Sequence, residues 1–375
     1  MCEANPEDDG AHEAVGRPKD RVCAKCGGED EEVLVALRNR VLCGSCVERT
    51  LSARTRRTLF RSQLTRSGLL ASGTTVALAF LANEAAEYAK IKWRVQGVFI
   101  DTSPHLKALA SDDDRAAAAA AVMAAADAQS LSLDVTTISA ELWPHLPSAE
   151  GVARVASMLA AEKTLSAREE LLHLLRHRAL VAYARRVGAD ALICGTSATA
   201  LAVDAFMMLV NGRGEQVPDA VNMEAVVPGE PNLWLLRPLL SNLHVEMRGV
   251  VRARSLLTAE LPPFTRGPSI PAPSAKATLR QLTATFMAGL QDEFPATLNA
   301  IAKTVRKLDV PDEAAFDPRL CALCCGRIAL PRIAGAPSSG PVPTGVHYGA
   351  IDELPHADDP APLCYACRQF AAPSM

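Results

Sequence analysis

The stretch TVALAFLANEAAEYAK, Thr75 to Lys90, decides how the fold of this chain is interpreted. Val76 to Phe80 is a short apolar run typical of a buried parallel strand, and a helix is predicted from Glu84 onward. Nucleotide-binding α/β proteins hold phosphate at such a strand-to-helix turn, because backbone N–H groups and the helix N-terminus face the anion. Glycine permits the close approach, but the turn Leu81 to Asn83 contains none. The stretch is therefore either an ordinary turn or a phosphate site that has been lost.

Strands and helices alternate along the rest of the central region. Further strands are predicted at Val95–Ile100, Leu133–Ile138, Asp190–Cys194 and Leu233–Arg237. Helices are predicted at Leu106–Gln129, Ser166–Gly188 and Ala200–Val210, with Ser166 and Glu169 as a capping box and Glu141–Gly151 as a loop. This alternation predicts an α/β fold with a doubly wound parallel sheet.

Composition limits the classes of function. The chain has 375 residues, of which 49% are hydrophobic, and a net charge of −3, so nucleic-acid binding would have to be local. Met1 to Asp20 is acidic without an apolar core, so we expect a disordered tail and no secretory signal. The longest apolar run, Leu69 to Ala82, is interrupted by polar residues, so no membrane span is predicted. We therefore expect a soluble intracellular protein.

Eleven cysteines in such a protein indicate metal binding rather than disulfides. Two CxxC pairs near the N-terminus are separated by a spacing typical of a tetrahedral zinc site, with ligands Cys23, Cys26, Cys43 and Cys46. Two short strands are predicted between the pairs, from Glu32 to Leu42. Unrelated buried cysteines or a redox dithiol are the alternatives.

A second set of paired cysteines lies near the C-terminus and predicts a second Cys₄ zinc site, with ligands Cys321, Cys324, Cys364 and Cys367. The long gap between its two pairs leaves two metal-free pairs as the alternative. Cys325 is a neighbour that could substitute in this site.

Other polar motifs have two interpretations each. An arginine-rich helix is predicted from Glu48 to Ser67, and its cations either form a solvated face or contact phosphates: Arg49, Arg54, Arg56, Arg57, Arg61 and Arg66. A loop after the strand ending at Cys194 either caps a helix or contacts phosphate through Gly195, Thr196, Ser197 and Thr199. Asn211 to Gly214 is either a turn or an anion contact. His173 and His177, one helical turn apart, could ligate a metal but lack a nearby third ligand.

These motifs together resemble the cytoplasmic tRNA 2-thiolation protein 2 family, the non-catalytic branch of the PP-loop ATPase-like tRNA thiolation proteins. The resemblance covers Cys23 to Arg368. It rests on CVERTLSARTRRTLF, GVFIDTS, SAREELLHLLRHRALVAYARRVGADALICGTSATALA, NGRG, LLRPL, CALC and LCYAC.

The resemblance implies a PP-loop-like core in which the nucleotide loop falls at Leu81, Ala82, Asn83, Glu84, Ala85 and Ala86 and is degenerate, so ATP binding is not expected. It implies a non-catalytic subunit that pairs with a catalytic thiolation protein and binds tRNA. The product would be the 2-thiouridine at the wobble position of tRNAs for Lys, Glu and Gln. Sulfur would come indirectly from a ubiquitin-like carrier, whose conjugation to proteins has also been linked to the family.

The expected organisation has five parts: an acidic tail at 1–20, a zinc ribbon with the arginine helix at 21–68, the core at 69–261, a linker with helices at 262–312, and a zinc segment at 313–375. A cytoplasmic location is expected. Two other functions remain open: an active ATP-dependent enzyme with an atypical phosphate site, or a zinc-ribbon regulator that binds nucleic acid.

Overall fold

A computed structural model of the chain describes residues 22–28, 34–37, 40–61, 68–72, 94–106, 112–258, 278–294, 297–305, 307–308, 316–329 and 362–370. Within these ranges, short strands and longer helices alternate through the central region, as the sequence predicts. None of the helices in these ranges is long and apolar enough to cross a membrane.

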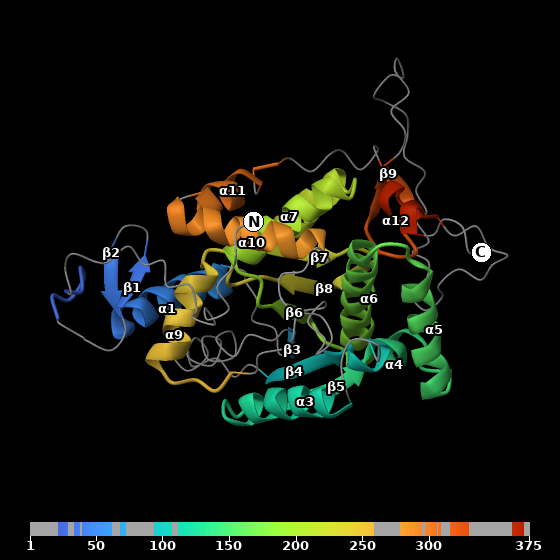
Figure 1. Ribbon diagram of the computed structural model, residues 1–375, viewed down its shortest axis with the longest axis horizontal. Coiled ribbons are helices and arrows are strands. Elements are labelled where there is room, and N and C mark those ends of the chain that lie inside the picture. The colour runs from blue at the N-terminus through green and yellow to red at the C-terminus, as the bar shows by residue number, and fades with distance from the viewer. Residues whose placement is uncertain are drawn as a thin grey trace, which may run out of the picture.

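A six-stranded sheet lies at the centre of the molecule (Figure 1). Its strands, in spatial order, are β5 (Leu133–Thr137), β4 (Arg94–Asp101), β3 (Gly68–Ser72), β6 (Ala191–Cys194), β8 (Glu230–Leu236) and β7 (Glu224–Val227). All neighbouring strands are parallel except β7, which runs antiparallel to β8. The predicted α/β fold with a parallel sheet is therefore confirmed.

Side chains of the central strands pack into two different cores. On β6, Ala191 and Ile193 belong to one cluster and Leu192 to the other. On β8, Leu236 joins the first cluster, while Leu235 joins the second. Because successive side chains of a strand point to opposite faces, both faces of the sheet are covered in this region.

Helices surround the sheet. Those of the central region are α3 (Asp112–Asp127), α4 (Ile138–Leu142), α5 (Ser148–Ala161), α6 (Leu165–Arg186), α7 (Ala198–Val210), α8 (Val217–Val221) and α9 (His244–Ala253). Two short 3₁₀ turns are η1 (Ser103–Leu106) and η2 (Gly214–Gln216). The helices α10 (Leu279–Glu293) and α11 (Thr297–Val305) follow and pack on α7. Figure 1 shows α7, α10 and α11 grouped above the sheet and α3 below it.

Two small antiparallel strand pairs flank this core. The first consists of β1 (Leu34–Leu37) and β2 (Arg40–Cys43), followed directly by α1 (Gly44–Arg61). The second consists of β9 (Phe316–Leu320) and β10 (Arg327–Ala329), which accompany the short helix α12 (Tyr365–Phe370). Figure 1 shows the two units at opposite ends of the molecule.

Several details differ from the prediction. The first strand of the described sheet is β3, Gly68–Ser72, and not Val76–Phe80, which lies outside the described residues. The predicted loop Glu141–Gly151 overlaps α4 and α5, because Pro147 directly precedes a new helix instead of ending structure. The cap of α6 is also different, since the hydroxyl of Thr164 accepts the N–H of Ala167. The predicted tail at 1–20 and the proline-rich part of the linker lie outside the described residues.

Candidate functional site

The four N-terminal cysteines converge as their spacing predicts. Their sulfur atoms all lie within 4.8 Å of one another, and the Sγ atoms of Cys26 and Cys43 are 3.7 Å apart. Cys23 and Cys26 lie on a tight turn, whereas Cys43 ends β2 and Cys46 lies in the first turn of α1. A turn and a helix start thus each supply two thiols to one point in space.

The four C-terminal cysteines form a second cluster with the same plan. Cys321 and Cys324 lie on a turn between β9 and β10, and Cys364 and Cys367 lie at the start of α12. Their sulfur atoms also lie within 4.8 Å of one another, with Cys324 and Cys364 3.8 Å apart. The cluster is part of the main hydrophobic core, because Cys321, Cys364 and Cys367 pack with residues of α6 and β8.

The backbone of the two turns is the same. The N–H of the first cysteine donates to the carbonyl five residues later, Cys23 to Gly28 and Cys321 to Gly326. The N–H four residues after the first cysteine donates back to it, from Gly27 and Cys325. Both donors have a left-handed backbone, with φ of 68° and 56°.

This geometry explains Cys325. It occupies the turn position that glycine occupies in the N-terminal site, and its sulfur is not part of the four-cysteine group. The expectation that Cys325 could replace a ligand therefore has no support in this arrangement.

Backbone amides favour the thiolate of Cys23, whereas burial raises the pKa of the Cys43 and Cys46 thiols. Burial opposes ionisation of Cys23, but N–H groups of Cys43, Cys26 and Lys25 face its sulfur, and the balance lowers its pKa to about 6. A thiolate is the form that binds metal. The arrangement can therefore hold one metal ion among four sulfur ligands.

The arginine helix has a structural side as well as a solvent side. Nη1 of Arg54 lies 3.1 Å from the carboxylate of Glu246 on α9, whose side chain is fully buried. Nε of Arg254, directly after α9, donates to Glu48 of α1 over 2.6 Å. Val47 and Leu51 are completely buried in the same interface. These contacts attach the N-terminal cysteine cluster to one face of the sheet.

The remaining arginines differ in their surroundings. Arg49 and Arg57 are exposed, whereas Arg56 is half-buried and has a partner within the protein. The side chain of Arg61 and the whole of Arg66 lie outside the described residues, as do the predicted loop residues 81–86. Arg49 and Arg57 are therefore the described candidates for a phosphate contact.

The hydroxyl loop after β6 mainly supports its own helix. The Ser197 hydroxyl caps α7 by accepting the N–H of Ala200 at 3.1 Å, and Thr199 accepts the N–H of His244 at 3.2 Å. Gly195 and Thr196 are half-exposed. The capping interpretation thus accounts for Ser197 and Thr199, and the phosphate interpretation stays a prediction.

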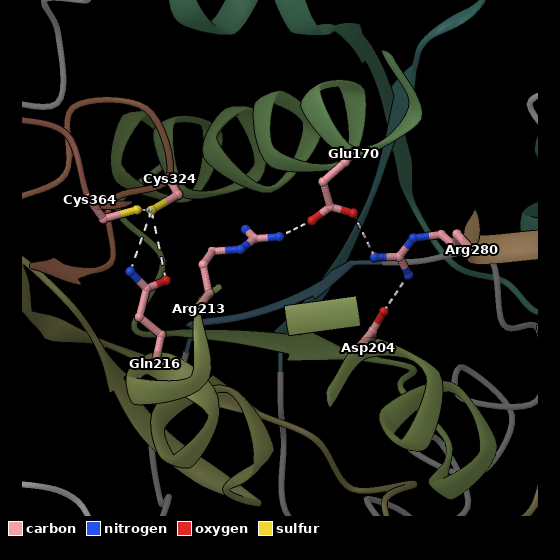
Figure 2. A network of polar contacts seen from close by, with 7 residues as sticks. All are labelled: Glu170, Asp204, Arg213, Gln216, Arg280, Cys324 and Cys364. Atoms are coloured by element: carbon pink, nitrogen blue, oxygen red, sulfur yellow. Dashed lines mark hydrogen bonds and ion pairs between the residues drawn. The ribbon is translucent and has the colours of Figure 1, made fainter. Parts of the chain in front are cut away.

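A buried ion-pair network was not predicted from the sequence. Glu170 of α6 accepts hydrogen bonds from Arg213 and Arg280, and Arg280 also pairs with Asp204 (Figure 2). Arg213 comes from the Asn211–Gly214 motif, so its described contact is an internal carboxylate rather than an external anion. The glycines that flank Arg213 marked it as a candidate for an anion contact. The sequence could not show that the anion is Glu170, because that residue lies 43 positions away.

The same region connects to the C-terminal cysteines. The side-chain amide of Gln216 lies 3.8–3.9 Å from Sγ of Cys324 (Figure 2). The same amide donates to the carbonyl of Arg327 at 2.8 Å. A side chain at Gly326 would collide with Gln216, since an added Cβ would lie 2.6 Å from its amide. The glycine therefore permits this close approach.

Comparison with known proteins identifies the relatives of this chain. Residues 278–333, from α10 to just beyond β10, match the family model described as cytoplasmic tRNA 2-thiolation protein 2. The protein of that name from Schizosaccharomyces pombe is 23% identical over 372 residues, covering 94% of this chain and 93% of the relative. The human protein of that name is 29% identical over 175 residues, covering 45% of this chain and 32% of the relative. The resemblance to this family is confirmed.

A solved structure extends the likeness to the fold. The U34-tRNA thiolase NcsA from Methanococcus maripaludis, described with its [4Fe-4S] cluster, superposes with a TM-score of 0.55 at 13% identity. The match covers 81% of this chain and 91% of the thiolase. At this level of identity the similarity concerns the fold alone.

Proposed function

We propose that this chain is a non-catalytic subunit of a cytoplasmic tRNA 2-thiolation complex. Its relatives carry the name cytoplasmic tRNA 2-thiolation protein 2 in fungi and vertebrates. In the proposed role, the chain pairs with a catalytic thiolation protein and helps bind tRNA for 2-thiolation of the wobble uridine in tRNAs for Lys, Glu and Gln. Sulfur reaches the partner through a ubiquitin-like carrier, whose conjugation to proteins depends on the same machinery.

The main support for a non-catalytic role is the number of cysteines in the core. Between residues 69 and 261 the sequence contains a single cysteine, Cys194. Burial raises the pKa of its thiol, whereas sulfur chemistry requires a thiolate. The other described cysteines are committed to the two clusters, apart from Cys325 beside the second. A core with this inventory suits a scaffold better than a sulfur-transferring enzyme.

The proposal also includes the class of fold. A PP-loop-like, doubly wound sheet is part of the proposal, and two observations support it. In the spatial order of the sheet, β4 and β5 lie on one side of β3, and β6 and β8 lie on the other side. Both faces of β6 and β8 are covered by packed side chains.

Zinc is the proposed metal in both clusters. Four thiolates about 2.3 Å from one zinc ion would lie about 3.8 Å from one another. The separations of 3.7 Å between Cys26 and Cys43 and of 3.8 Å between Cys324 and Cys364 agree with that value. An iron–sulfur cluster between the thiolates would hold them further apart than a single ion does. Zinc would have a structural role here, because all four positions around it are filled by protein ligands.

Exposed arginines of α1 are the proposed tRNA contacts. Arg49 and Arg57 extend into solvent from the helix that follows the N-terminal cluster. Arginine binds phosphate oxygens through its planar fork of donors. A local basic helix can supply this contact although the whole chain is slightly acidic.

An active ATP-dependent enzyme is the second candidate, and one observation favours it. Since β3 ends at Ser72, the residues that follow it in sequence are Gly73, Thr74 and Thr75. These are residue types that phosphate loops use. The proposed degenerate loop at 81–86 assumed a strand at 76–80 instead.

A thiolation assay separates the two candidates. We expect the purified chain alone neither to adenylate nor to thiolate tRNA, and cells lacking it to lose wobble thiolation, seen as lost retardation of these tRNAs on a mercury-containing gel. If a Cys194→Ser variant restores wobble thiolation in cells that lack the chain, the scaffold role is supported. Normal retardation in cells without the chain would refute the proposal, and micromolar ATP binding with adenylation by the isolated chain would favour the enzyme.

One experiment tests both the proposed catalytic partner and the alternative that the chain is a zinc-ribbon regulator. A pull-down with mass spectrometry should recover the catalytic thiolation protein and tRNA. Recovery of other nucleic acid without that protein would support a zinc-ribbon regulator instead.

A further inference from the structure

The two cysteine clusters share one backbone plan but differ at one position of the turn. The residue five positions after the first cysteine is a glycine in both, Gly28 in the N-terminal cluster and Gly326 in the C-terminal cluster. An added Cβ at Gly28 would meet Sγ of Cys26 at 3.5 Å. An added Cβ at Gly326 would instead lie 2.6–2.8 Å from the side-chain amide of Gln216. Gln216, which comes from outside the turn, therefore occupies this position in the C-terminal cluster.

Gln216 is held in place at both its backbone and its side chain. Its backbone N–H donates to the carbonyl of Arg213 at 3.1 Å, within the region of η2. Arg213 is itself buried and pairs with Glu170 of α6 (Figure 2). Nε2 of Gln216 donates to the carbonyl of Arg327 at 2.8 Å, and only 6% of Gln216 is exposed. The amide therefore has a fixed position and a fixed orientation beside the cluster.

The orientation of the amide decides which of its atoms serves a metal-bound cysteine. Nε2 and Oε1 of Gln216 lie 3.9 Å and 3.8 Å from Sγ of Cys324 (Figure 2). The carbonyl of Arg327 accepts hydrogen bonds and donates none, so the amide atom that contacts it is the nitrogen, whose second N–H is available to the sulfur. A cysteine that binds metal is a thiolate, which can only accept. Nε2 is therefore the atom of Gln216 that suits the metal-loaded cluster.

Other groups of the C-terminal turn act in the same direction. The backbone N–H of Gly326 donates to Sγ of Cys324 at 3.4 Å. The guanidinium of Arg178, which is buried on α6, donates to the carbonyl of Ala322, between Cys321 and Cys324. Four thiolates around one divalent ion leave a net negative charge, and a buried charge is costly unless donors or opposite charges surround it. The C-terminal turn therefore supplies both to a buried anionic centre.

The matching ligand of the N-terminal cluster lies in different surroundings. Cys26 corresponds to Cys324, because each is the second cysteine of the first CxxC pair in its cluster. Cys26 is exposed, whereas Cys324 is half-buried and packs against the main hydrophobic core. The protein around a metal site controls the access of solvent to its ligands. The two clusters thus offer the same four ligands with unequal protection.

We propose that Gln216 is a positioning residue for the C-terminal metal, and that it makes this metal the more firmly bound of the two. Its amide N–H donates to the Cys324 thiolate, fixes the direction of that ligand and offsets part of its charge. Residues that contact metal ligands in this way change metal affinity by about 10- to 100-fold. The chain accordingly holds one permanent metal in its core and one exchangeable metal beside α1. This inference rests on the proposed metal in the clusters and not on the thiolation role.

The test measures each cluster separately in the zinc-loaded full chain, as the rate at which a chromogenic chelator removes the metal. Cys23→Ser leaves the C-terminal site, and Cys321→Ser leaves the N-terminal site. We expect the N-terminal site to release zinc about tenfold faster than the C-terminal site. In the Cys23→Ser background, Gln216→Glu replaces the donating amide with a carboxylate of the same shape and should speed release about tenfold.

Two further variants in the same background separate the lost N–H from the added charge. Gly326→Ala displaces the amide of Gln216 without adding a charge, and it should also speed release. Gln369→Glu adds the same charge at an exposed position on α12, and it should change the rate by less than about twofold because it touches no ligand. Thermal melts of the metal-loaded variants verify folding.

Cobalt in place of zinc gives a readout that a merely structural role would not move. A hydrogen bond to a thiolate lowers the energy of its lone pairs, so loss of the bond brings the sulfur-to-cobalt charge-transfer band to longer wavelength. We expect this shift in both Gln216→Glu and Gly326→Ala, and no shift in Gln369→Glu.

The outcomes distinguish this inference from the proposed metal. Zinc release and a cobalt band that stay unchanged in Gln216→Glu and Gly326→Ala would overturn the role of Gln216. Equal release from the two clusters would overturn the difference between them. Absence of metal from both clusters would refute the proposed zinc as well. If Gln216→Glu fails to fold, Gly326→Ala decides, because its clash falls on the far end of a flexible side chain.

Discussion

Arg54 of α1 and Glu246 of α9 are joined by an ion pair in which Nη1 of the arginine lies 3.1 Å from both carboxylate oxygens. The carboxylate is completely buried and also accepts the backbone N–H of Leu243 at 2.8 Å. The pair connects the helix after the N-terminal cysteine cluster to the helix after β8. Arg54 is therefore a structural contact between two parts of the chain 192 residues apart.

Removal of this pair should destabilise the protein. We expect Arg54→Ala to lower the free energy of unfolding by about 2 kcal/mol, less than for a fully buried pair because Arg54 is partly exposed. Arg57→Ala, on the exposed side of the same helix, should change it by less than about 0.5 kcal/mol. Urea denaturation measures both. If Arg54→Ala and Arg57→Ala both change the free energy of unfolding only slightly, the buried carboxylate of Glu246 does not need Arg54 as a partner.

The tRNA contact is best tested with Arg49 and Arg57, the two described arginines of α1 that are exposed. We expect Arg49→Ala combined with Arg57→Ala to weaken tRNA binding and reduce the salt slope by about 1 for each lost phosphate contact. The matched control is Arg154→Ala with Lys303→Ala, which removes two exposed cations from α5 and α11. Fluorescence anisotropy over a salt series is the measurement. A slope equal to that of the control pair would assign α1 to structure alone.

Metal content tests the two cysteine clusters separately. We expect close to two zinc ions per chain, one lost in Cys23→Ser and the other in Cys321→Ser, because each variant removes one of four ligands. Cys325→Ser should retain both ions, since its sulfur lies outside the group. Elemental analysis after gel filtration gives the count. Iron in place of zinc, or loss of zinc in Cys325→Ser, would contradict the assignment.

The turn that holds Cys23 and Cys26 depends on the backbone of Gly27. Its φ is 68°, and an added Cβ would meet nothing within 4 Å. Gly27→Ala should therefore cost about 1 kcal/mol through the left-handed conformation alone. Gly27→Asn should cost less, because asparagine tolerates this conformation. Denaturation of the metal-loaded variants compares them, and equal costs would indicate a different origin of the effect.

The two histidines of α6 should make stability depend on pH. Desolvation by the surrounding protein and nearby arginines lower the pKa of His173 to about 3 and that of His177 to about 4, against about 6.5 in the unfolded chain. The unfolded state binds more protons between these values, so stability is full above about pH 6.5 and falls as the pH approaches 4.

The matched comparison for this effect is the double variant His173→Asn with His177→Asn, which cannot titrate. It should lose less stability than the wild type between pH 7 and pH 5. Urea midpoints at the two pH values provide the measurement. Identical losses would mean that both imidazoles become protonated without penalty in the folded protein.

Local sequence signals predicted many elements of the fold. The strands β6 and β8 follow from apolar runs, and α7 follows from a hydroxyl cap before an apolar stretch. The position of the first core strand was predicted wrongly, because the apolar run from Leu69 to Ala82 is longer than one strand. Which part of it pairs with β4 and β6 is decided by register with those strands.

By itself the sequence determined the two cysteine clusters, since CxxC spacing places two thiols on one turn wherever that turn lies. It also determined the alternation of strands and helices, which depends on local periodicity. Only the tertiary structure decided what the charged side chains do. It directed Arg54 and Arg213 to buried carboxylates and gave Cys325 a turn position. Such outcomes depend on contacts between residues far apart in the chain, and local sequence carries no signal for them.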